Sequence, residues 1–396
     1  MSAEQIKNIE NLIPLGKGKK MVNWKIKRFT ASGENYGSLM LSVDIVVKTP
    51  TGSEEIHAIA KAIPHSEFIQ KLFNAPVTFR NEITFYKKIL PMLQRFQRQH
   101  GVKEVIDFVP KYYGSRLNLK GDEDKVDQDA VLLLENLTVA NYTTLDRTQG
   151  FDLDAAKLII TDLAQFHAVP LAFKLKKPEI FEREIMPYLR LWVPKQRGRI
   201  YLRKKLSQLI DDIEELKPVK ERILKVFEES FTPRETRETF ATIVHNDCWM
   251  NNFLFKLENG KPVKSVMVDY QSCSYGSPAR DIVFFLFSSV KDDVLKDHYD
   301  DLIKLYHQIF MSTLGKLKCV KTPFIFEALQ QEINYEARYS QFVHVAFMLY
   351  PIFIPKAEVR DITEHDAKMM LSHKIPEAQK RKFVFIVNEF IKRKWI

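Results

Sequence analysis

The sequence predicts an α+β protein with two lobes, a small antiparallel-sheet lobe at the N-terminus and a larger helical lobe behind it. Strand-like runs at 24–29, 39–48 and 55–63 follow one another with turn clusters between them, which indicates an antiparallel meander. From residue 151 onward, apolar residues recur mostly at helical spacing. The composition changes at 135–150, so we place the lobes at residues 1–138 and 139–396.

The other elements of the first lobe follow from periodicity. Apolar residues spaced by three and four predict a helix at 79–97, which Pro91 should kink or end locally. An amphipathic pattern indicates another helix at 1–13. A strand at 112–119, an exposed acidic hairpin loop at 121–127 and a buried strand at 131–134 complete this lobe.

The second lobe is predicted to be helical, interrupted by short β-like runs at 253–255 and 263–268. The expected helices are 154–167, 180–192, 202–231, 280–290, 298–314, 326–349 and 380–395.

The composition is that of a soluble globular chain. Of 396 residues, 45% are hydrophobic and 28% are charged, which excludes a disordered chain. No apolar stretch of about 18–20 residues and no signal peptide stand out, so we expect a cytoplasmic protein that does not enter a membrane. The three cysteines include no Cys-x-x-Cys pair and predict free thiols.

The formal net charge of +10 favours anionic partners without choosing among them. Basic clusters at 174–177, 195–205 and 380–382 alternate with apolar residues at helical spacing, which is typical of solvated helix faces. Since no nucleic-acid recognition motif accompanies them, we expect no nucleic-acid partner. We also expect a monomer.

The densest polar segment lies at 244–255, between apolar runs. Asp247 and Asn252 are five positions apart in a loop that returns to a strand, and Asp269 follows the next buried strand. Such oxygens suit magnesium bound to phosphates, and a further carboxylate can take a proton from a hydroxyl. The alternative is that these are turn and capping residues, which Asn and Asp also favour.

The first lobe offers a cation for phosphates. Lys61 lies in the middle of a strand, where it needs an anionic partner, and Glu82 near the start of the next helix could provide it. A lysine on an edge strand is the alternative. The turn Gly33-Glu34-Asn35-Tyr36-Gly37-Ser38 could cover phosphates with its backbone N–H groups, although two glycines in a hairpin are common.

Together these motifs resemble the ecdysteroid kinase-like family of insects, within the aminoglycoside phosphotransferase and choline kinase superfamily. The resemblance runs in motif order from about residue 39 to 287. It rests on residues 33–38, Ala60-Lys61, Phe79 with Glu82, Phe85 and Tyr86, residues 133–137, Phe166-His167-Ala168, His245-Asn246-Asp247 through Asn252, Asp269-Tyr270-Gln271 and residues 275–281.

The resemblance implies a bilobal protein kinase-like fold that binds ATP and Mg2+. By it, Asp247 is the catalytic base, Asn252 and Asp269 bind magnesium, Lys61 holds the α and β phosphates, and Glu82 anchors Lys61. The nucleotide would also contact Gly33, Asn35, Tyr36 and Ser38, and a hinge formed by Glu135, Asn136 and Leu137 would meet adenine. Asp281 would brace the catalytic loop.

Two residues depart from the family pattern. Asn246 replaces the usual Gly of His-Gly-Asp, and Tyr270 replaces the Phe that follows the metal-binding Asp. Asn tolerates left-handed backbone, and Tyr270 adds only a hydroxyl, so neither change removes a ligand.

We therefore expect a small-molecule kinase that phosphorylates a hydroxyl of an apolar acceptor, an ecdysteroid or a xenobiotic. The alternative is a catalytically silent nucleotide-binding protein of the same fold. An aromatic stripe, formed by Tyr335, Tyr339, Phe342, Phe347, Tyr350 and Phe353, belongs either to the core or to an apolar acceptor site.

Overall fold

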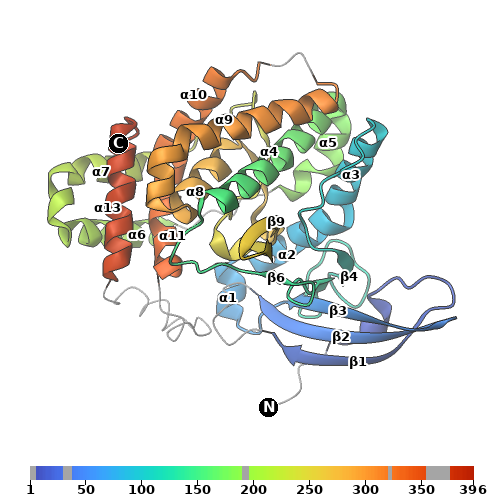
Figure 1. Cartoon of the computed structure of the whole chain (residues 1–396). Helices are drawn as coiled ribbons and strands as arrows, with labels where there is room; N and C mark the ends of the chain where they lie inside the picture. Colours follow the sequence, from blue (N-terminus) through green and yellow to red (C-terminus); the bar gives the residue numbers. More distant parts are fainter. Residues whose placement is uncertain (1–5, 30–37, 190–195, 320–322, 354–374) are drawn as a thin grey trace.

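The computed structural model describes residues 6–29, 38–189, 196–319, 323–353 and 375–396. An N-terminal sheet lies below a larger helical part, as Figure 1 shows. This is the predicted α+β fold with a sheet-rich N-terminal lobe and a helical C-terminal lobe. The lobe boundary at residue 138 stays a prediction.

The N-terminal sheet has five antiparallel strands in the order β1-β2-β3-β5-β4. Strands β1 to β3 form the predicted meander, and the acidic loop at 121–127 lies in the connection between β4 and β5. The bounds are β1 (Lys20–Arg28), β2 (Leu39–Thr49), β3 (Gly52–Ala62), β4 (Tyr112–Arg116) and β5 (Val131–Glu135).

One face of this sheet has its own apolar core. Alternate residues of β2, among them Val43 and Val47, are fully buried, as expected for a strand with one covered face. Ile9 and Leu12 pack on the same core. The predicted helix at 1–13 is wrong over its described part, which holds only the 3₁₀ turn Ile9–Asn11 after a left-handed Asn8. So short a segment gains little from helix formation, and its apolar residues pack singly on the sheet.

The helix predicted at 79–97 is found in three pieces. α1 (Glu67–Leu72) precedes it, α2 (Ala75–Thr84) leads into a π-helical turn at Phe85–Ile89, and α3 (Leu90–Gln99) follows. In the π turn, the N–H of Leu90 donates to the carbonyl of Phe85, five residues back. The wider turn comes just before Pro91, which has no N–H to donate to a preceding carbonyl and lies in the first turn of α3, where that donor is not required.

The helical lobe is built around α4 (Leu153–Lys176), which packs along α9 (Asp292–Lys316) (Figure 1). By length and composition alone α4 could span a membrane, but 67% of its apolar window is buried in the protein, as in the core helix of a globular fold. The other helices are α5 (Pro178–Glu184), α6 (Gln196–Asp211), α7 (Lys220–Glu229), α8 (Ala279–Ser289), α10 (Phe326–Glu336), α11 (Phe342–Phe353) and α13 (Glu377–Lys392).

Two predicted long helices are interrupted. The one expected at 202–231 breaks between α6 and α7 at the 3₁₀ segment Glu214–Val219, which contains Pro218. The one expected at 326–349 contains a π-helical turn, Ala337–Gln341, between α10 and α11. Pro218 accounts for the first break, because proline lacks the N–H that a helix interior requires.

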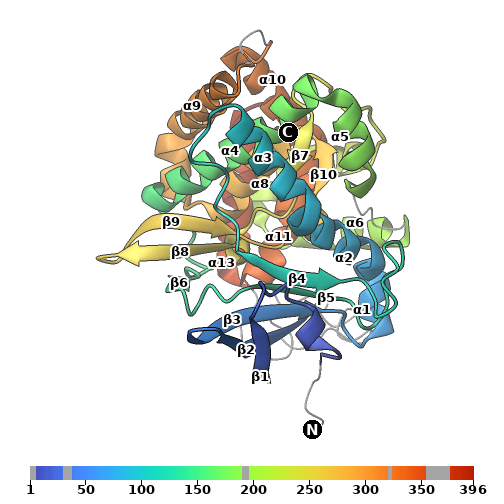
Figure 2. The same ribbon diagram turned by 90° about the vertical axis from the view of Figure 1, so that its right-hand side faces the viewer.

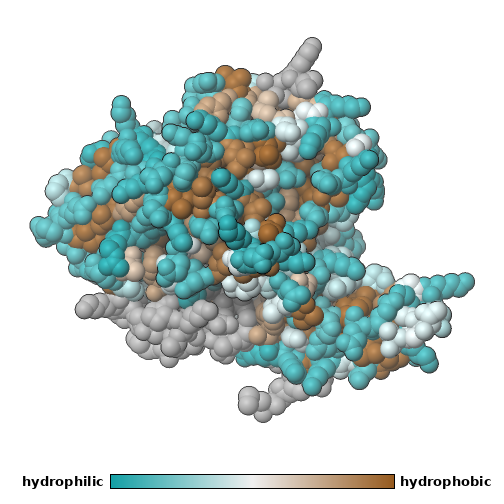
Figure 3. Space-filling view, viewed as in Figure 1, coloured by the Kyte–Doolittle hydropathy of each residue, from teal (hydrophilic) through white to brown (hydrophobic). Residues whose placement is uncertain are grey.

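Short strands position the polar loops between the lobes. β6 (Tyr142–Thr143), β8 (Phe253–Glu258) and β9 (Lys261–Met267) form a small sheet, and β7 (Thr242–Val244) pairs with β10 (Ser274–Gly276). Figure 2 shows β8 and β9 between the five-stranded sheet and the helices. The larger core continues from α2 and α3 into the helical lobe, as the contact between the rings of Phe96 and Phe173 shows (centroids 5.2 Å apart). The face in Figure 3 is mostly hydrophilic, with scattered apolar patches.

Gly114 gives a test of how the N-terminal segment packs on β4. A Cβ built at Gly114 would lie 1.9 Å from the backbone carbonyl oxygen of Leu12, whereas one at Gly16 would meet nothing within 4 Å. We expect Gly114→Ala to lower the free energy of unfolding by about 1–3 kcal/mol, because backbone must move to admit the methyl group. Gly16→Ala is the control and should change it by less than about 0.5 kcal/mol. Urea denaturation measures both, and equal stability of the two variants would contradict this packing.

Candidate active site

A buried ion pair network joins the two lobes. Lys61, on β3, places its Nζ 2.6 Å from Oε2 of Glu82 on α2 and 2.7 Å from Oδ1 of Asp269, which follows β9. Lys61 and Glu82 are 5% and 2% exposed. The structure therefore brings together the lysine, its predicted anchor and one predicted metal ligand.

The pKa values in this network follow from burial and charge. Burial disfavours the ammonium of Lys61, but the carboxylates of Asp269 and Glu82 outweigh burial and raise the pKa of Lys61. Burial raises the pKa of Glu82 to about 7, against the lowering effect of Lys61. With both carboxylates ionised, two negative charges face one ammonium, so the site favours a further cation.

The catalytic loop follows β7 directly. Asn252, in the 3₁₀ turn Met250–Asn252, donates from Nδ2 to the backbone carbonyl of Asp247 and to its Oδ2, both at 2.8 Å. Burial and the nearby Asp269 carboxylate raise the pKa of Asp247 to about 7. A carboxylate whose pKa lies near neutrality is suited to accept a proton from a hydroxyl.

The carboxylate of Asp281, on α8, holds this loop through hydrogen bonds to its backbone. Its Oδ2 accepts from the backbone N–H of His245 at 2.6 Å, and its Oδ1 accepts from that of Asn246 at 2.8 Å. Nε2 of His167 lies 3.0 Å from Oδ2. Although burial would raise it, the hydrogen bond and charge of His167 lower the pKa of Asp281. These bonds confirm the predicted bracing role.

His167 and His245 serve the loop as hydrogen-bonding groups. Nδ1 of His167 lies 2.9 Å from the hydroxyl of Tyr306 on α9, and Nε2 of His245 lies 3.0 Å from the carbonyl of Val268. Because both rings are fully buried, they fix the loop against α9 and against the end of β9.

Asn246 does more than replace a glycine. Its backbone is left-handed (φ 61°), the conformation that Gly or Asn adopts most readily. Its Nδ2 also donates to the carbonyl of Ser272 and to Oγ of Ser274, both at 2.8 Å. Asn246 thus ties the catalytic loop to the segment that follows Asp269, a contact that the sequence pattern did not reveal.

The segment after β9 is fixed by stacking. Asp269 is left-handed (φ 69°), and the ring of Tyr270 stacks on Phe85 with centroids 4.0 Å apart. The buried hydroxyl of Tyr270 has no hydrogen-bond partner within the described residues. Nε2 of Gln271 donates to Oδ2 of Asp269 at 3.3 Å, so Gln271 orients the carboxylate. In the sequence, the only indication of this contact is the position of Gln271 two residues after Asp269.

The predicted hinge lies where β5 ends. The N–H of Glu135 donates to the carbonyl of Lys111, and that of Asn136 donates to the carbonyl of His57. Within the described parts of the chain, the N–H of Leu137 donates to no backbone carbonyl, and the contact of this hinge with adenine stays a prediction.

The predicted phosphate-covering turn is described only at its end. Gly33, Asn35 and Tyr36 lie outside the described residues. Oγ of Ser38 contacts Sδ of Met40 at 3.8 Å.

The donors near Asp269 fit magnesium that is shared with a nucleotide. The described ranges contain no group of three or more His, Cys, Asp or Glu residues that could enclose a metal alone. Asn252 uses its amide nitrogen on Asp247, which leaves its carbonyl oxygen free to face a cation beside Asp269. Few protein oxygens, completed by phosphates and water, are what Mg2+ uses in phosphoryl-transfer sites.

Comparison with families of known sequence gives the class of this protein, a kinase-like phosphotransferase. The sequence model of the ecdysteroid kinase-like family matches residues 32–319, which is more than half of the chain. The chain belongs to this family. A comparison with curated proteins finds no significant match.

The solved structures whose backbone follows a similar path have low sequence identity to this chain. The GDP and kanamycin complex of an aminoglycoside 2''-phosphotransferase shares 14% identity, covering 92% of this chain and 94% of that one, with a TM-score of 0.45. Spectinomycin phosphotransferase in complex with ADP and spectinomycin shares 11% identity, covering 91% and 92%, with a TM-score of 0.42. A macrolide 2'-phosphotransferase shares 12% identity, covering 87% and 94%, with a TM-score of 0.35.

Asp281 offers a test of the loop geometry. In Asp281→Asn, the amide nitrogen faces the N–H of Asn246 in one orientation and the N–H of His245 together with His167 in the other, so at least one backbone hydrogen bond is lost and the loop shifts. We expect turnover, followed as ADP release, to fall about tenfold or more, because small displacements of reacting groups slow transfer strongly. Asp300→Asn, at an exposed position of α9, is the control. If Asp281→Asn turned over like the control, Asp281 would not position the loop.

Proposed function

We propose that this protein transfers the γ-phosphoryl group of ATP to a hydroxyl of an apolar small molecule, an ecdysteroid or a xenobiotic. The observation that supports this most is the meeting of Lys61, Asp247, Asn252 and Asp269. Lys61 contacts Asp269 directly, Asn252 contacts Asp247, and the charge of Asp269 acts on Asp247. Phosphoryl transfer requires a cation for phosphates, two metal ligands and a base for the hydroxyl.

Each residue has a defined part in this reaction. Lys61 turns from Asp269 to the α and β phosphates and remains held by Glu82. Asn252 and Asp269 would hold Mg2+, which neutralises charge on the phosphates when it is bound. Asp247, held by Asn252, orients the acceptor hydroxyl and takes its proton as the bond between the acceptor oxygen and the γ-phosphorus forms. The bond from that phosphorus to the β–γ bridging oxygen breaks, and ADP leaves. Catalysis then comes from positioning and electrostatic stabilisation.

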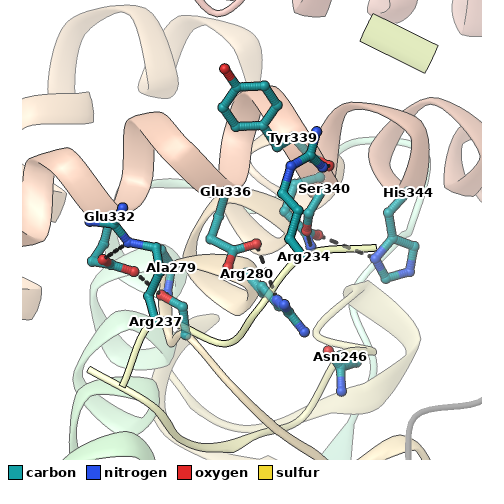
Figure 4. A network of polar contacts seen from close by, with 12 residues as sticks. Arg234, Arg237, Asn246, Ala279, Arg280, Glu332, Glu336, Tyr339, Ser340 and His344 are labelled. Carbon is teal, nitrogen blue, oxygen red and sulfur yellow. Dashed lines mark hydrogen bonds and ion pairs between the residues drawn. The ribbon is translucent and has the colours of Figure 1, made fainter. Parts of the chain in front are cut away.

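We place the acceptor beside Asn246, where the nearby polar groups carry no net charge. Nε of Arg280 donates to Oε2 of Glu336 at 3.1 Å, which neutralises both. The ring of His344 stacks on Phe284, and burial lowers the pKa of His344 to about 4. Figure 4 shows Arg280 and His344 on the side of their helices that faces Asn246. Because Nδ1 of His344 donates to Oε1 of Gln341 at 3.3 Å, the neutral imidazole offers Nε2 as an acceptor for a hydroxyl, which favours an uncharged, hydroxylated acceptor.

The acceptor is best found by direct screening. The protein is incubated with ATP, Mg2+ and two panels, polyhydroxylated sterols and plant-derived phenols and glycosides, and mass spectrometry detects an added phosphate. Products in the sterol panel support the ecdysteroid assignment, and products only in the other panel support a xenobiotic acceptor. Magnesium-dependent ATP binding without any product would favour the catalytically silent alternative.

Asp247→Ala tests the base. We expect transfer to fall by about 10²–10⁴-fold, the usual contribution of a positioned base, while ADP binding stays within about threefold of wild type. Single-turnover assays and titration with ADP measure the two effects. Turnover like that of the wild type would remove Asp247 from the mechanism.

Asp269→Asn tests the metal ligands. The change keeps the size of the side chain but removes the charge that favours a divalent cation, so the Mg2+ concentration for half-maximal activity should rise about tenfold or more. Magnesium titrations at saturating ATP measure it. Asp300→Asn again serves as the control, and an unchanged magnesium requirement would argue against Asp269 as a ligand.

A further inference from the structure

A second cavity lies outside the active site, on the opposite side of α10. Its volume is about 490 Å³. In Figure 4 the ring of Tyr339 points away from Asn246 and the catalytic loop. Its walls include Arg237, Tyr335, Arg338, Tyr339, Arg393 and Lys394.

The charge on this cavity is one-sided. Four of its lining residues are cations and none is acidic. Three carboxylates compensate from the sides, since Glu332 pairs with Arg237, Glu229 with Arg338 and Glu389 with Arg393. A further cation, Arg234, contacts the carbonyls of Thr232 and Tyr339 instead of a carboxylate. The cluster therefore carries an excess of positive charge.

Two guanidinium groups also share one aromatic ring. The guanidinium carbons of Arg234 and Arg338 lie 4.3 and 5.2 Å from the ring centroid of Tyr339. The ring attracts both cations, which gathers positive charge around it. An anion bound nearby would be attracted by both.

Several donors in the cavity are unused. Arg237 gives Nε to Glu332, which leaves its terminal nitrogens free for another acceptor. Nε of Arg338 is buried and has no hydrogen-bond partner in the part of the chain that the structure describes. Within the same residues Lys394 pairs with no carboxylate, although it is exposed. The ion pairs of Arg237 and Arg393 with Glu332 and Glu389 would also serve a purely structural role. Nε of Arg338 and the ammonium of Lys394 take part in no such pair within the described residues.

The walls indicate the body of the ligand. The rings of Tyr335 and Tyr339 lie side by side, with centroids 5.0 Å apart, and the buried Trp395 also lines the cavity. This wide, open depression offers more room than one phosphate ion needs, so an organic body can lie against its walls with one side exposed to solvent. Arginine forks bind phosphate oxygens in pairs, and aromatic walls favour an apolar body.

We propose that this cavity binds an organic phosphate monoester, a dianionic phosphate on an aromatic or alicyclic body. The site is separate from the nucleotide site and does not depend on the proposed function. Arg237 connects it to the catalytic half of the protein, because its partner Glu332 also accepts from Oγ of Ser277, just before α8 (Figure 4).

The test is calorimetric titration of the full-length protein with 1-naphthyl phosphate, with ADP and Mg2+ present to fill the nucleotide site. Inorganic phosphate and 1-naphthol are titrated in parallel to separate the head group from the body. The site variant is Arg338→Gln/Lys394→Gln. The control, Arg95→Gln/Lys256→Gln, removes the same charge from exposed positions elsewhere. The single variant Lys394→Gln and the melting temperature of every variant guard against loss of folding.

We expect 1-naphthyl phosphate to bind wild type and control with affinities within about twofold of each other, and the site variant at least about tenfold more weakly, since two charge-assisted contacts are lost. Lys394→Gln alone should weaken binding by a smaller factor. Both parallel ligands should bind more weakly than the ester. Equal binding to the site variant and the control, no binding to wild type at millimolar concentration, or inorganic phosphate binding as well as the ester would each overturn the proposal.

Discussion

The carboxylate of Asp281 is the constraint on which the catalytic geometry depends. It is fully buried, and it accepts from two successive backbone N–H groups of the loop and from His167 on α4. A buried carboxylate is stable only when such donors surround it, so loop, α4 and α8 hold one arrangement together. His245 then extends the network to the carbonyl of Val268, next to Asp269. Asp247 and Asp269, the proposed base and the proposed metal ligand, thus derive their relative positions from one buried charge.

A second constraint joins the lobes. Lys61 belongs to the sheet, whereas Glu82 lies on α2, whose apolar face packs in the same core as the helical lobe. The ammonium can satisfy Glu82 and Asp269 together only when the sheet lies against that core. Phosphates and magnesium would take over the contact with Asp269 and leave the pair with Glu82 intact. The same lysine can therefore hold the lobes together and bind the nucleotide.

The sequence predicted the elements and residues that local patterns encode. The meander, the central helices, the loop with Asp247 and Asn252 before a short strand and the position of Asp269 after the next one follow from periodicity and turn chemistry. Contacts made only by tertiary folding were not predictable, including the amide of Asn246 on Ser272 and the orientation of Asp269 by Gln271. The residues of the aromatic stripe also have different surroundings, which only tertiary folding determines. Phe342 packs in the core against Phe390, whereas Tyr339 lines the arginine-rich cavity. Helical spacing alone places such residues on a face but does not say what covers it.

The π-helical turn at Ala337–Gln341 joins α10 and α11 into one continuous helix. It explains how this helix presents side chains both to the active site and to the second cavity. Glu332, Glu336, Ser340 and His344 are spaced by four, and in a regular α-helix each step of four would rotate the side chain by about 40°. After three steps His344 would lie about 120° away from Glu332 and would no longer face the catalytic loop. The wider π turn takes more residues per turn and reverses part of this drift. Figure 4 shows the four side chains along one side of this helix and Tyr339 on the other. The irregular turn thus keeps polar groups directed at the acceptor side while it directs Tyr339 to the second cavity.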